Sequence, residues 1–123
     1  MVTAKHRRGK RAEKQALFFL ISKGFSLVAR NYSSRYGEID LIVQSRTHIV
    51  FVEVKMRNDT RHGTPQEYVT LKKQEKIILT SQQFLQQYPT YRSHQPRYDV
   101  VGITPKEITW VPNAFSCNLK KAL

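Results

Sequence analysis

The fold is decided by two neighbouring apolar stretches, YGEIDLIV at residues 36–43 and IVFVEVK at residues 49–55. Both are rich in β-branched and aromatic residues, and the polar residues 44–48 between them suit a turn. We therefore expect two antiparallel strands. If the turn is centred between Arg46 and Thr47, residues at equal distances from that point face each other, which places Asp40 opposite Glu53 and Glu38 opposite Lys55.

Charged side chains interrupt this apolar hairpin. Alternation along a strand puts successive side chains on opposite faces, so the four charged residues share one face. The other face is filled by Ile39, Leu41, Val43, Val50, Val52 and Val54. A one-residue change of register would send Asp40 and Glu53 to opposite faces, so the prediction depends on the register.

Two carboxylates directly opposite each other repel, and a cation between them reverses the sign of that interaction. A hard divalent ion such as Mg²⁺ is commonly held by one or two carboxylates together with water and phosphate oxygens. Lys55 stands beside this acid pair in the sequence. The residues therefore predict a Mg²⁺ site at Asp40 and Glu53 that would accept a nucleic acid.

The composition indicates a small, strongly basic protein. Its 123 residues suit a single domain, and 21 Lys and Arg against 9 Asp and Glu give a formal charge of +12. We expect a polyanionic partner, with nucleic acid as the first candidate and an anionic membrane surface as the second. Cys117 is the only cysteine, which excludes a disulfide framework and a cysteine zinc site. The longest strongly apolar run, residues 16–21, is too short to span a membrane, so we expect a cytoplasmic protein.

The N-terminal part predicts a basic arm at residues 1–8 and a helix at residues 10–23 that Gly24 ends. The apolar stripe of this helix contains Ala12, Ala16, Leu17 and Leu20. Glu13 lies within about 20° of Leu20 on a helical wheel of about 100° per residue. Two interpretations stay open: Glu13 is a third acid delivered to the sheet, or it forms an ion pair at the edge of the stripe.

The remaining elements follow from turn and helix signals. We expect a strand at 25–32, a loop at 58–63, a helix start at 64–67 with Thr64 as N-cap and Glu67 completing a capping box, a helix at 71–88, strands at 97–103 and 107–111, and an irregular tail at 112–123. The helix at 71–88 has an apolar face, and we place Lys72, Lys73 and Lys76 on its other face. Its first turns would bring Lys72 or Gln66 near a bound phosphate. Asp99 is expected to pair with Arg97.

Taken together, these segments resemble the YraN-like family of proposed endonucleases, within the PD-(D/E)xK nuclease superfamily, and more remotely the archaeal Holliday junction resolvases. The resemblance covers residues 9–101 and rests on residues 9–20 with the helix acid, RN at 30–31, GEIDLI at 37–42, VEVKMR at 52–57, GTP at 63–65, Lys72 and RYDV at 97–100. The chain departs from the family pattern at Ala12, Ile39, His62 and Tyr98, and none of these replaces a ligand.

The resemblance implies a restriction-endonuclease-like α/β fold, a three-layer core whose mixed central sheet has helices on both faces, in the order α-β-β-β-α-β-β. It implies that Asp40, Glu53, the Val54 carbonyl and Glu13 bind Mg²⁺ or Mn²⁺, and that Lys55 orients or deprotonates the attacking water. Glu38 would tune Lys55 or form an ordinary cross-strand ion pair with it. The reaction would be hydrolysis of DNA phosphodiester bonds, with branched DNA favoured, by a homodimer.

Several basic residues would contact the phosphates of this DNA: Arg7, Arg8, Lys10, Arg11, Arg57 and Lys72. Two other classes of function stay open. The first is a catalytically silent nucleic-acid-binding module of the same fold, and the second is a protein that binds an acidic partner protein. The complete set of Asp40, Glu53 and Lys55 argues against the first of these, since binding a polyanion does not require acids.

Overall fold

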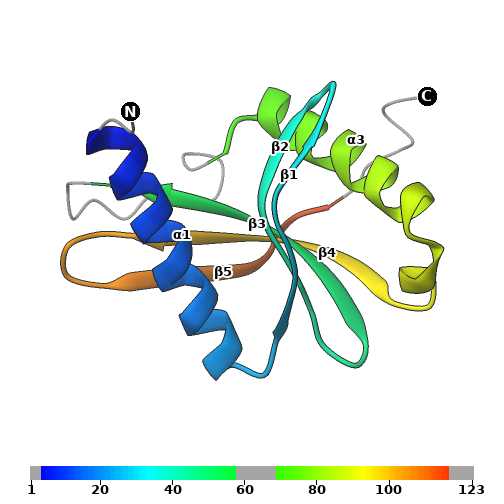
Figure 1. Cartoon of the computed structure of the whole chain (residues 1–123), viewed down its shortest axis with the longest axis horizontal. Helices are drawn as coiled ribbons and strands as arrows, with labels where there is room; N and C mark the ends of the chain where they lie inside the picture. Colours follow the sequence, from blue (N-terminus) through cyan, green and yellow to red (C-terminus); the bar gives the residue numbers. More distant parts are fainter. Residues whose placement is uncertain (1–3, 58–68, 117–123) are drawn as a thin grey trace.

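The computed structural model describes residues 4–57 and 69–116, with the backbone alone for residues 4–8. The chain forms helix α1 (Ala4–Ser22), strands β1 (Ser26–Ser34), β2 (Gly37–Gln44) and β3 (His48–Met56), helix α3 (Leu71–Gln87), the 3₁₀ turn η1 (Pro89–Tyr91), and strands β4 (Gln95–Ile103) and β5 (Ile108–Phe115) (Figure 1). The predicted order of helices and strands is confirmed. Neither helix in the described segments is long and apolar enough to cross a membrane.

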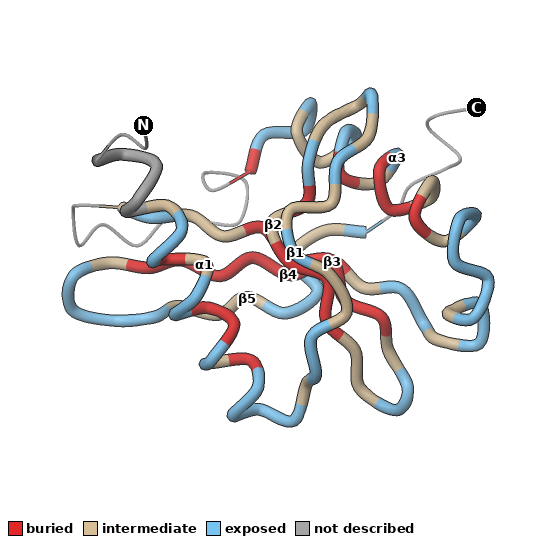
Figure 2. The backbone as a smooth tube through the Cα atoms, viewed as in Figure 1, coloured by how far each residue is buried: buried red, intermediate tan, exposed pale blue. Residues whose placement is uncertain are grey.

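The five strands form one mixed sheet in the order β1-β2-β3-β4-β5. Strands β1 to β3 are antiparallel neighbours, β3 and β4 run parallel, and β5 returns antiparallel to β4. The parallel pair requires a crossover connection, and α3 belongs to it. Strand β3 is thus the central strand, and most of its residues are buried (Figure 2).

The register of the central hairpin agrees with the sequence-based expectation. Leu41 pairs with Val52, Ile42 with Phe51, and Val43 with Val50, as the turn between Arg46 and Thr47 requires. The β2–β3 pairing begins at Leu41 and Val52 and does not extend to residues 38 and 55. Asp40 and Glu53 therefore flank the first pair of this ladder, at the point where the two strands separate.

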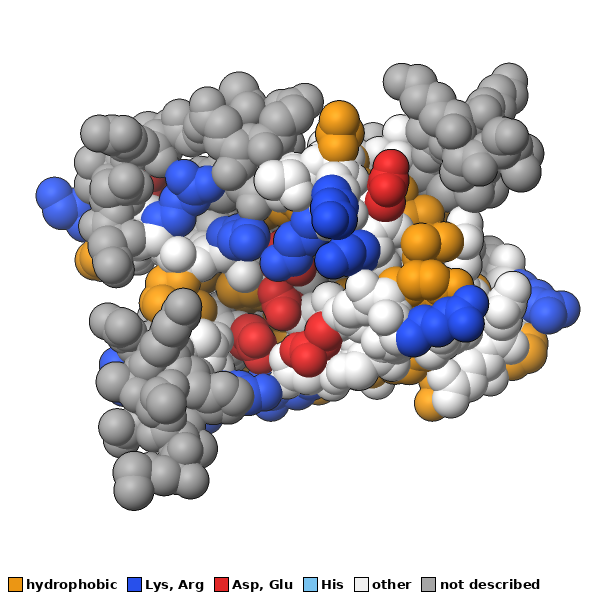
Figure 3. Space-filling view, turned by 90° about the horizontal axis from the view of Figure 1, so that it is seen from above, with side chains coloured by type: hydrophobic (Ala, Val, Ile, Leu, Met, Phe, Trp, Pro, Cys, Tyr) orange, Lys and Arg blue, Asp and Glu red, His pale blue; other side chains and the backbone are white. Residues whose placement is uncertain are grey.

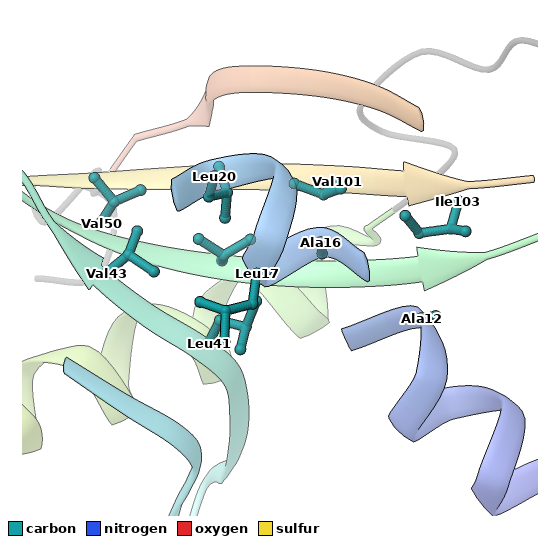
Figure 4. Packing of buried hydrophobic residues seen from close by; sticks show 10 residues of the cluster. Ala12, Ala16, Leu17, Leu20, Leu41, Val43, Val50, Val101 and Ile103 are labelled. Carbon is teal, nitrogen blue, oxygen red and sulfur yellow. The ribbon is translucent and has the colours of Figure 1, made fainter. Parts of the chain in front are cut away.

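Helices cover both faces of the sheet. The core on the α1 face contains Ala12, Ala16, Leu17, Leu20, Leu41, Val43, Val50, Val52, Val101 and Ile103 (Figure 4). The core on the α3 face contains Ile39, Ile42, Ile49, Phe51, Val69, Ile77, Phe84, Tyr98 and Val100. With apolar side chains on both faces, the three-layer arrangement expected from the resemblance is present.

One residue of the hairpin lies on the other side of the sheet from its predicted position. Ile39 was expected to share a face with Leu41, but it packs in the α3 core together with Ile42, while Leu41 packs against α1. Strict alternation would keep residues 39 and 41 together. The alternation is broken between them, at Asp40, where the pairing with β3 has ended and β2 is paired with β1 alone.

The first helix and the last strand extend further than the sequence predicted. Helix α1 already begins at Ala4, so residues 4–8 of the expected arm are helical, and Gly24 adopts a φ of 99° after its last turn. The tail was expected to be irregular from Pro112, but β5 continues to Phe115. The pairing of β4 with β5 shifts register at Asp99, opposite the segment that contains Pro112. Proline has no backbone N–H to donate to a neighbouring strand, and a bulge in an edge strand accommodates this loss.

Candidate metal and nucleic-acid site

The Asp40 carboxylate is fixed by the backbone of the neighbouring strand. Its Oδ2 accepts a hydrogen bond of 2.8 Å from the Val54 N–H, so the side chain is held against β3 where the ladder has ended. Burial raises the pKa of Asp40 to about 7, and the nearby carboxylates of Glu53 and Glu13 act in the same direction. The hydrogen bond from Val54 and the charge of Lys73 oppose this rise. Three acids thus act on one another at this point.

Glu53 is buried at the end of β3 with only 4% of its surface exposed. Its Oε1 lies 2.7 Å from Lys73 Nζ of α3 and 3.9 Å from Lys55 Nζ of its own strand. A buried carboxylate needs such partners, because an isolated charge away from water is strongly unfavourable. The ammonium of Lys73 makes the closer contact.

The two lysines influence each other. Burial and the neighbouring Lys73 charge lower the pKa of Lys55, although the carboxylates of Glu53 and Asp40 counteract the effect. Burial also lowers the pKa of Lys73, but its hydrogen bond and charge contact with Glu53 outweigh this and the net direction is upward. Lys55 is therefore the lysine of the pair that releases its proton more readily.

Lys73 was placed on the solvent face of its helix from the sequence, and that placement is wrong. It lies four residues before the buried Ile77, on the same side of α3 as Thr80, Ser81 and Phe84. Thr70 caps the helix and accepts a hydrogen bond from the Lys73 N–H, which fixes this first turn. The i, i+4 spacing of Lys73 and Ile77 was the signal that could have identified it.

Glu13 of α1 reaches the site through an asparagine of the edge strand. Asn31 Nδ2 donates to Glu13 Oε1 at 3.1 Å and to Glu38 Oε1 at 3.0 Å, while Asn31 Oδ1 accepts from Lys10 Nζ at 2.6 Å. Lys10 also lies 3.9 Å from Glu13. Both interpretations of Glu13 from the sequence therefore apply in part, since it makes an ion pair with Lys10 and acts on Asp40. Asn31 joins the two acids, and sequence reasoning gave it no role.

The expected contact between Glu38 and Lys55 is not formed. Glu38 is exposed and accepts hydrogen bonds from Asn31 and from Ser33 Oγ, both on the side of β1. The β2–β3 ladder ends before Glu38, so opposition across that hairpin does not hold there. Glu38 is held by β1 and faces away from the lysine it was expected to tune.

Basic side chains border the acids. A hollow of about 320 Å³ is lined by Gly37, Glu38, Thr70, Lys72, Lys73, Lys76 and Ile77. Figure 3 shows Asp and Glu side chains gathered directly beside a group of Lys and Arg side chains. Arg57 follows β3 and donates its backbone N–H to Ile103, and Arg11 is exposed on α1. The side chains of Arg7 and Arg8, together with Gln66 and the helix start at 64–67, lie outside the described residues.

The donor set fits a divalent ion of a particular kind. Within residues 4–57 and 69–116, no three Asp, Glu, His or Cys side chains lie close enough together to hold a metal ion. An all-protein cage is therefore not offered by these residues. Mg²⁺ commonly takes one or two carboxylates and keeps several waters, and Asp40 and Glu53 meet that requirement.

Asp99, the other buried acid of the sheet, has a structural role, as the sequence predicted. Arg97 donates to both of its oxygens at 2.9 Å, and Trp110 Nε1 and the Asn113 N–H donate at 3.0 and 2.9 Å. These bonds tie β4 to the bulge of β5. Asp99 thus holds the edge of the sheet together.

The chain resembles proteins from several bacteria. The profile of Uncharacterised protein family UPF0102 matches residues 12–103. A UPF0102 protein of Saccharophagus degradans is 42% identical over 116 residues, which cover 94% of this chain and 98% of the relative. Relatives in Acinetobacter baumannii and Francisella tularensis are 40% and 37% identical and cover 88% and 87% of this chain, or 93% and 92% of their own lengths.

A solved structure has the same fold. The 1.6 Å structure of Archaeoglobus fulgidus Hjc, a Holliday junction resolvase from an archaeal hyperthermophile, superposes with a TM-score of 0.57 over 83% of this chain and 73% of that chain. The sequences are 19% identical. The likeness confirms the predicted restriction-endonuclease-like architecture.

Proposed function

Because the chain belongs to Uncharacterised protein family UPF0102 and shares the fold of a Holliday junction resolvase, we propose that it is a metal-dependent endonuclease that hydrolyses DNA phosphodiester bonds. The observation that carries the proposal is the pair of carboxylates, Asp40 and Glu53, beside Lys55 at the end of the β2–β3 ladder. Two like charges held together away from water destabilise the folded state. Such pairs are therefore typical of sites that bind or act on a ligand.

Asp40 and Glu53 would hold the ion, Mg²⁺ or Mn²⁺, with water and phosphate oxygens completing its shell. A bound ion of this kind lowers the pKa of its water and neutralises charge on the phosphoryl group. The Val54 N–H holds Asp40 in place for this purpose. Glu13 and the Val54 carbonyl are proposed as further ligands.

Lys55 would act on the attacking water. Its Nζ lies 3.9 Å from Glu53, and burial together with the Lys73 charge lowers its pKa, so this nitrogen releases a proton more readily than an ordinary lysine does. An ammonium at the same position would also stabilise negative charge on the phosphoryl oxygens. Lys55 therefore combines two roles that hydrolysis of a phosphodiester needs.

DNA would lie across the basic border of the acids. Lys72 and Lys76 line the hollow beside Glu38, and Arg11 and Arg57 extend the positive surface on α1 and after β3. A formal charge of +12 makes this binding strongly dependent on salt. The name of the structural neighbour, a Holliday junction resolvase, favours branched DNA as the substrate. A homodimer as the active form is proposed from the resemblance of the sequence alone.

The test is a cleavage assay on four-way junction, flap, single-stranded and duplex DNA with Mg²⁺, Mn²⁺ or EDTA. Wild-type protein is expected to cut at least one of these with a metal and none with EDTA. Asp40→Asn and Lys55→Met are expected to bind the same DNA without cutting it. The proposal fails if wild-type protein cuts no substrate with either metal.

A second function, a catalytically silent nucleic-acid-binding module, is favoured by one observation. Lys73 lies 2.7 Å from Glu53 and already neutralises it, so the acid pair has a stable arrangement that needs no metal. In that case binding would be equally tight with EDTA and with Mg²⁺, and it would fall steeply with salt. The same assays therefore separate the two functions.

A further inference from the structure

Lys73 holds the position on Glu53 that a cation would take. Its Nζ lies 2.7 Å from Glu53 Oε1, closer than Lys55 at 3.9 Å, and Glu53 is almost fully buried. A divalent ion bound to the same carboxylate oxygen would bring a second positive charge within a few ångströms of the ammonium. Like charges at that distance repel strongly where water is scarce. The ion pair and the cation therefore compete for Glu53.

The Lys73 side chain can also reach a second position, away from Glu53. It is 42% exposed, and its flexible stem begins on the first turn of α3. It lines a hollow together with Lys72, Lys76 and the exposed Glu38. An ammonium released from Glu53 would join the other two lysines of this hollow, where three positive charges against the one carboxylate of Glu38 favour a phosphate group.

We propose that Lys73 is a resident counter-cation and positioning residue of the site. Its ammonium neutralises Glu53 while no divalent cation is bound, and it turns to a phosphate of the nucleic acid when the cation takes its place. This inference rests on the proposed function and makes it more specific. It couples cation binding to phosphate binding through one side chain.

The first experiment measures the affinity of the purified chain for Mn²⁺ alone, by electron paramagnetic resonance of free Mn²⁺. Lys73→Met removes the competitor and is expected to bind Mn²⁺ about fivefold to tenfold more tightly than Lys72→Met. Lys72→Met is a matched control, because it makes the same change of charge and shape one residue away, on an exposed side chain without the contact to Glu53. Equal affinities in the two variants would overturn the proposal.

The second experiment measures the affinity for a four-way DNA junction with EDTA and with Ca²⁺. Lys72→Met is expected to weaken binding in both conditions. Lys73→Met is expected to weaken binding by a larger factor with Ca²⁺ than with EDTA, where Lys73 is occupied by Glu53. A loss of the same size for Lys73→Met in both conditions would contradict the switch of partner.

Lys73→Arg keeps the proposal testable if Lys73→Met does not fold. Guanidinium binds carboxylate through two parallel hydrogen bonds, so Arg is expected to hold Glu53 more firmly and to weaken Mn²⁺ binding, while Lys72→Arg leaves it unchanged. Unchanged or tighter binding by Lys73→Arg would count against the proposal. If Mn²⁺ affinities shift as stated but the wild type cuts no DNA, the inference stands and the enzyme proposal fails. If the wild type cuts DNA and the affinities do not differ, the inference alone fails.

Discussion

Replacing Asp40 with Asn should stabilise the metal-free protein at neutral and alkaline pH. Asp40 is largely enclosed by the sheet, and burial together with the Glu53 carboxylate raises its pKa from 3.8 to about 7. The folded state therefore binds this proton more tightly than the unfolded state does. Between about pH 4 and pH 7 the unfolded chain loses the proton first, so stability falls as the pH rises through this window.

The size of the effect follows from the displaced pKa. Each factor of ten in proton affinity corresponds to 1.36 kcal/mol, so a rise from 3.8 to about 7 corresponds to at most about 4 kcal/mol of lost stability above pH 7. Asn carries no charge at any of these pH values, and its carbonyl oxygen still accepts the hydrogen bond from the Val54 N–H. The stability of Asp40→Asn should therefore not fall through this pH window as that of the wild type does.

The assay is urea unfolding with EDTA at pH 4 and pH 8. The advantage of Asp40→Asn over the wild type should grow by about 2–4 kcal/mol between the two pH values. Glu38→Gln is the matched control, since it removes an exposed acid from the same strand and should stay within about 0.5 kcal/mol of the wild type at both. An advantage that is absent at pH 8, or equal at both pH values, would refute the reasoning.

Three further outcomes are expected. Lys55→Met should lower DNA cleavage by about 10²-fold or more while DNA binding in a gel-shift assay changes little, and equal losses of both would contradict its role at the reacting atoms. Asp99→Asn should lower the free energy of unfolding by about 3 kcal/mol in denaturant titration, because it leaves Arg97 without its paired charge, and an unchanged value would show that β5 is held by other contacts. Asn31→Gly should lower the free energy of unfolding by about 1 kcal/mol because the side-chain hydrogen bonds are lost. Asn31→Ala should lower it by about 1 kcal/mol more, because alanine, unlike glycine, is strained at a φ of 51°. Equal losses in the two variants would show that this backbone conformation does not contribute.

The predicted strand register depended on one assumption, a turn centred between Arg46 and Thr47, and the pairs from Leu41 to Gln44 confirm it. From that centre every facing pair of the hairpin follows. The same rule failed at Ile39 and at Glu38, since both lie beyond the point where the ladder ends. Facing pairs can be inferred only as far as the strands remain hydrogen-bonded, and the sequence does not mark where that bonding stops.

The missed residues of the site were hidden for different reasons. Lys73 begins the buried stripe of α3, but an amphipathic pattern is judged by its apolar members, so a lysine at its end was counted with its solvated neighbours. Asn31 joins Glu13 to Glu38 only because its backbone adopts a positive φ, which turns the side chain out of the regular strand pattern. Such a conformation is open to Asn but is not required by it, and it is visible only in the folded chain.

Two acids of the sheet, Asp99 and Asp40, show how a candidate ligand site differs from a structural ion pair. Asp99 receives hydrogen bonds from Arg97, Trp110 and Asn113 on both of its oxygens, so the fold itself compensates its charge. Asp40 is held by the Val54 N–H, while Glu53 and Glu13 oppose its ionisation. The fold compensates the charge of Asp99, whereas it opposes the ionisation of Asp40, and a cation bound there would relieve that opposition. This difference supports the proposal that a cation binds at Asp40 and the neighbouring Glu53 and not at Asp99, which holds the edge of the sheet.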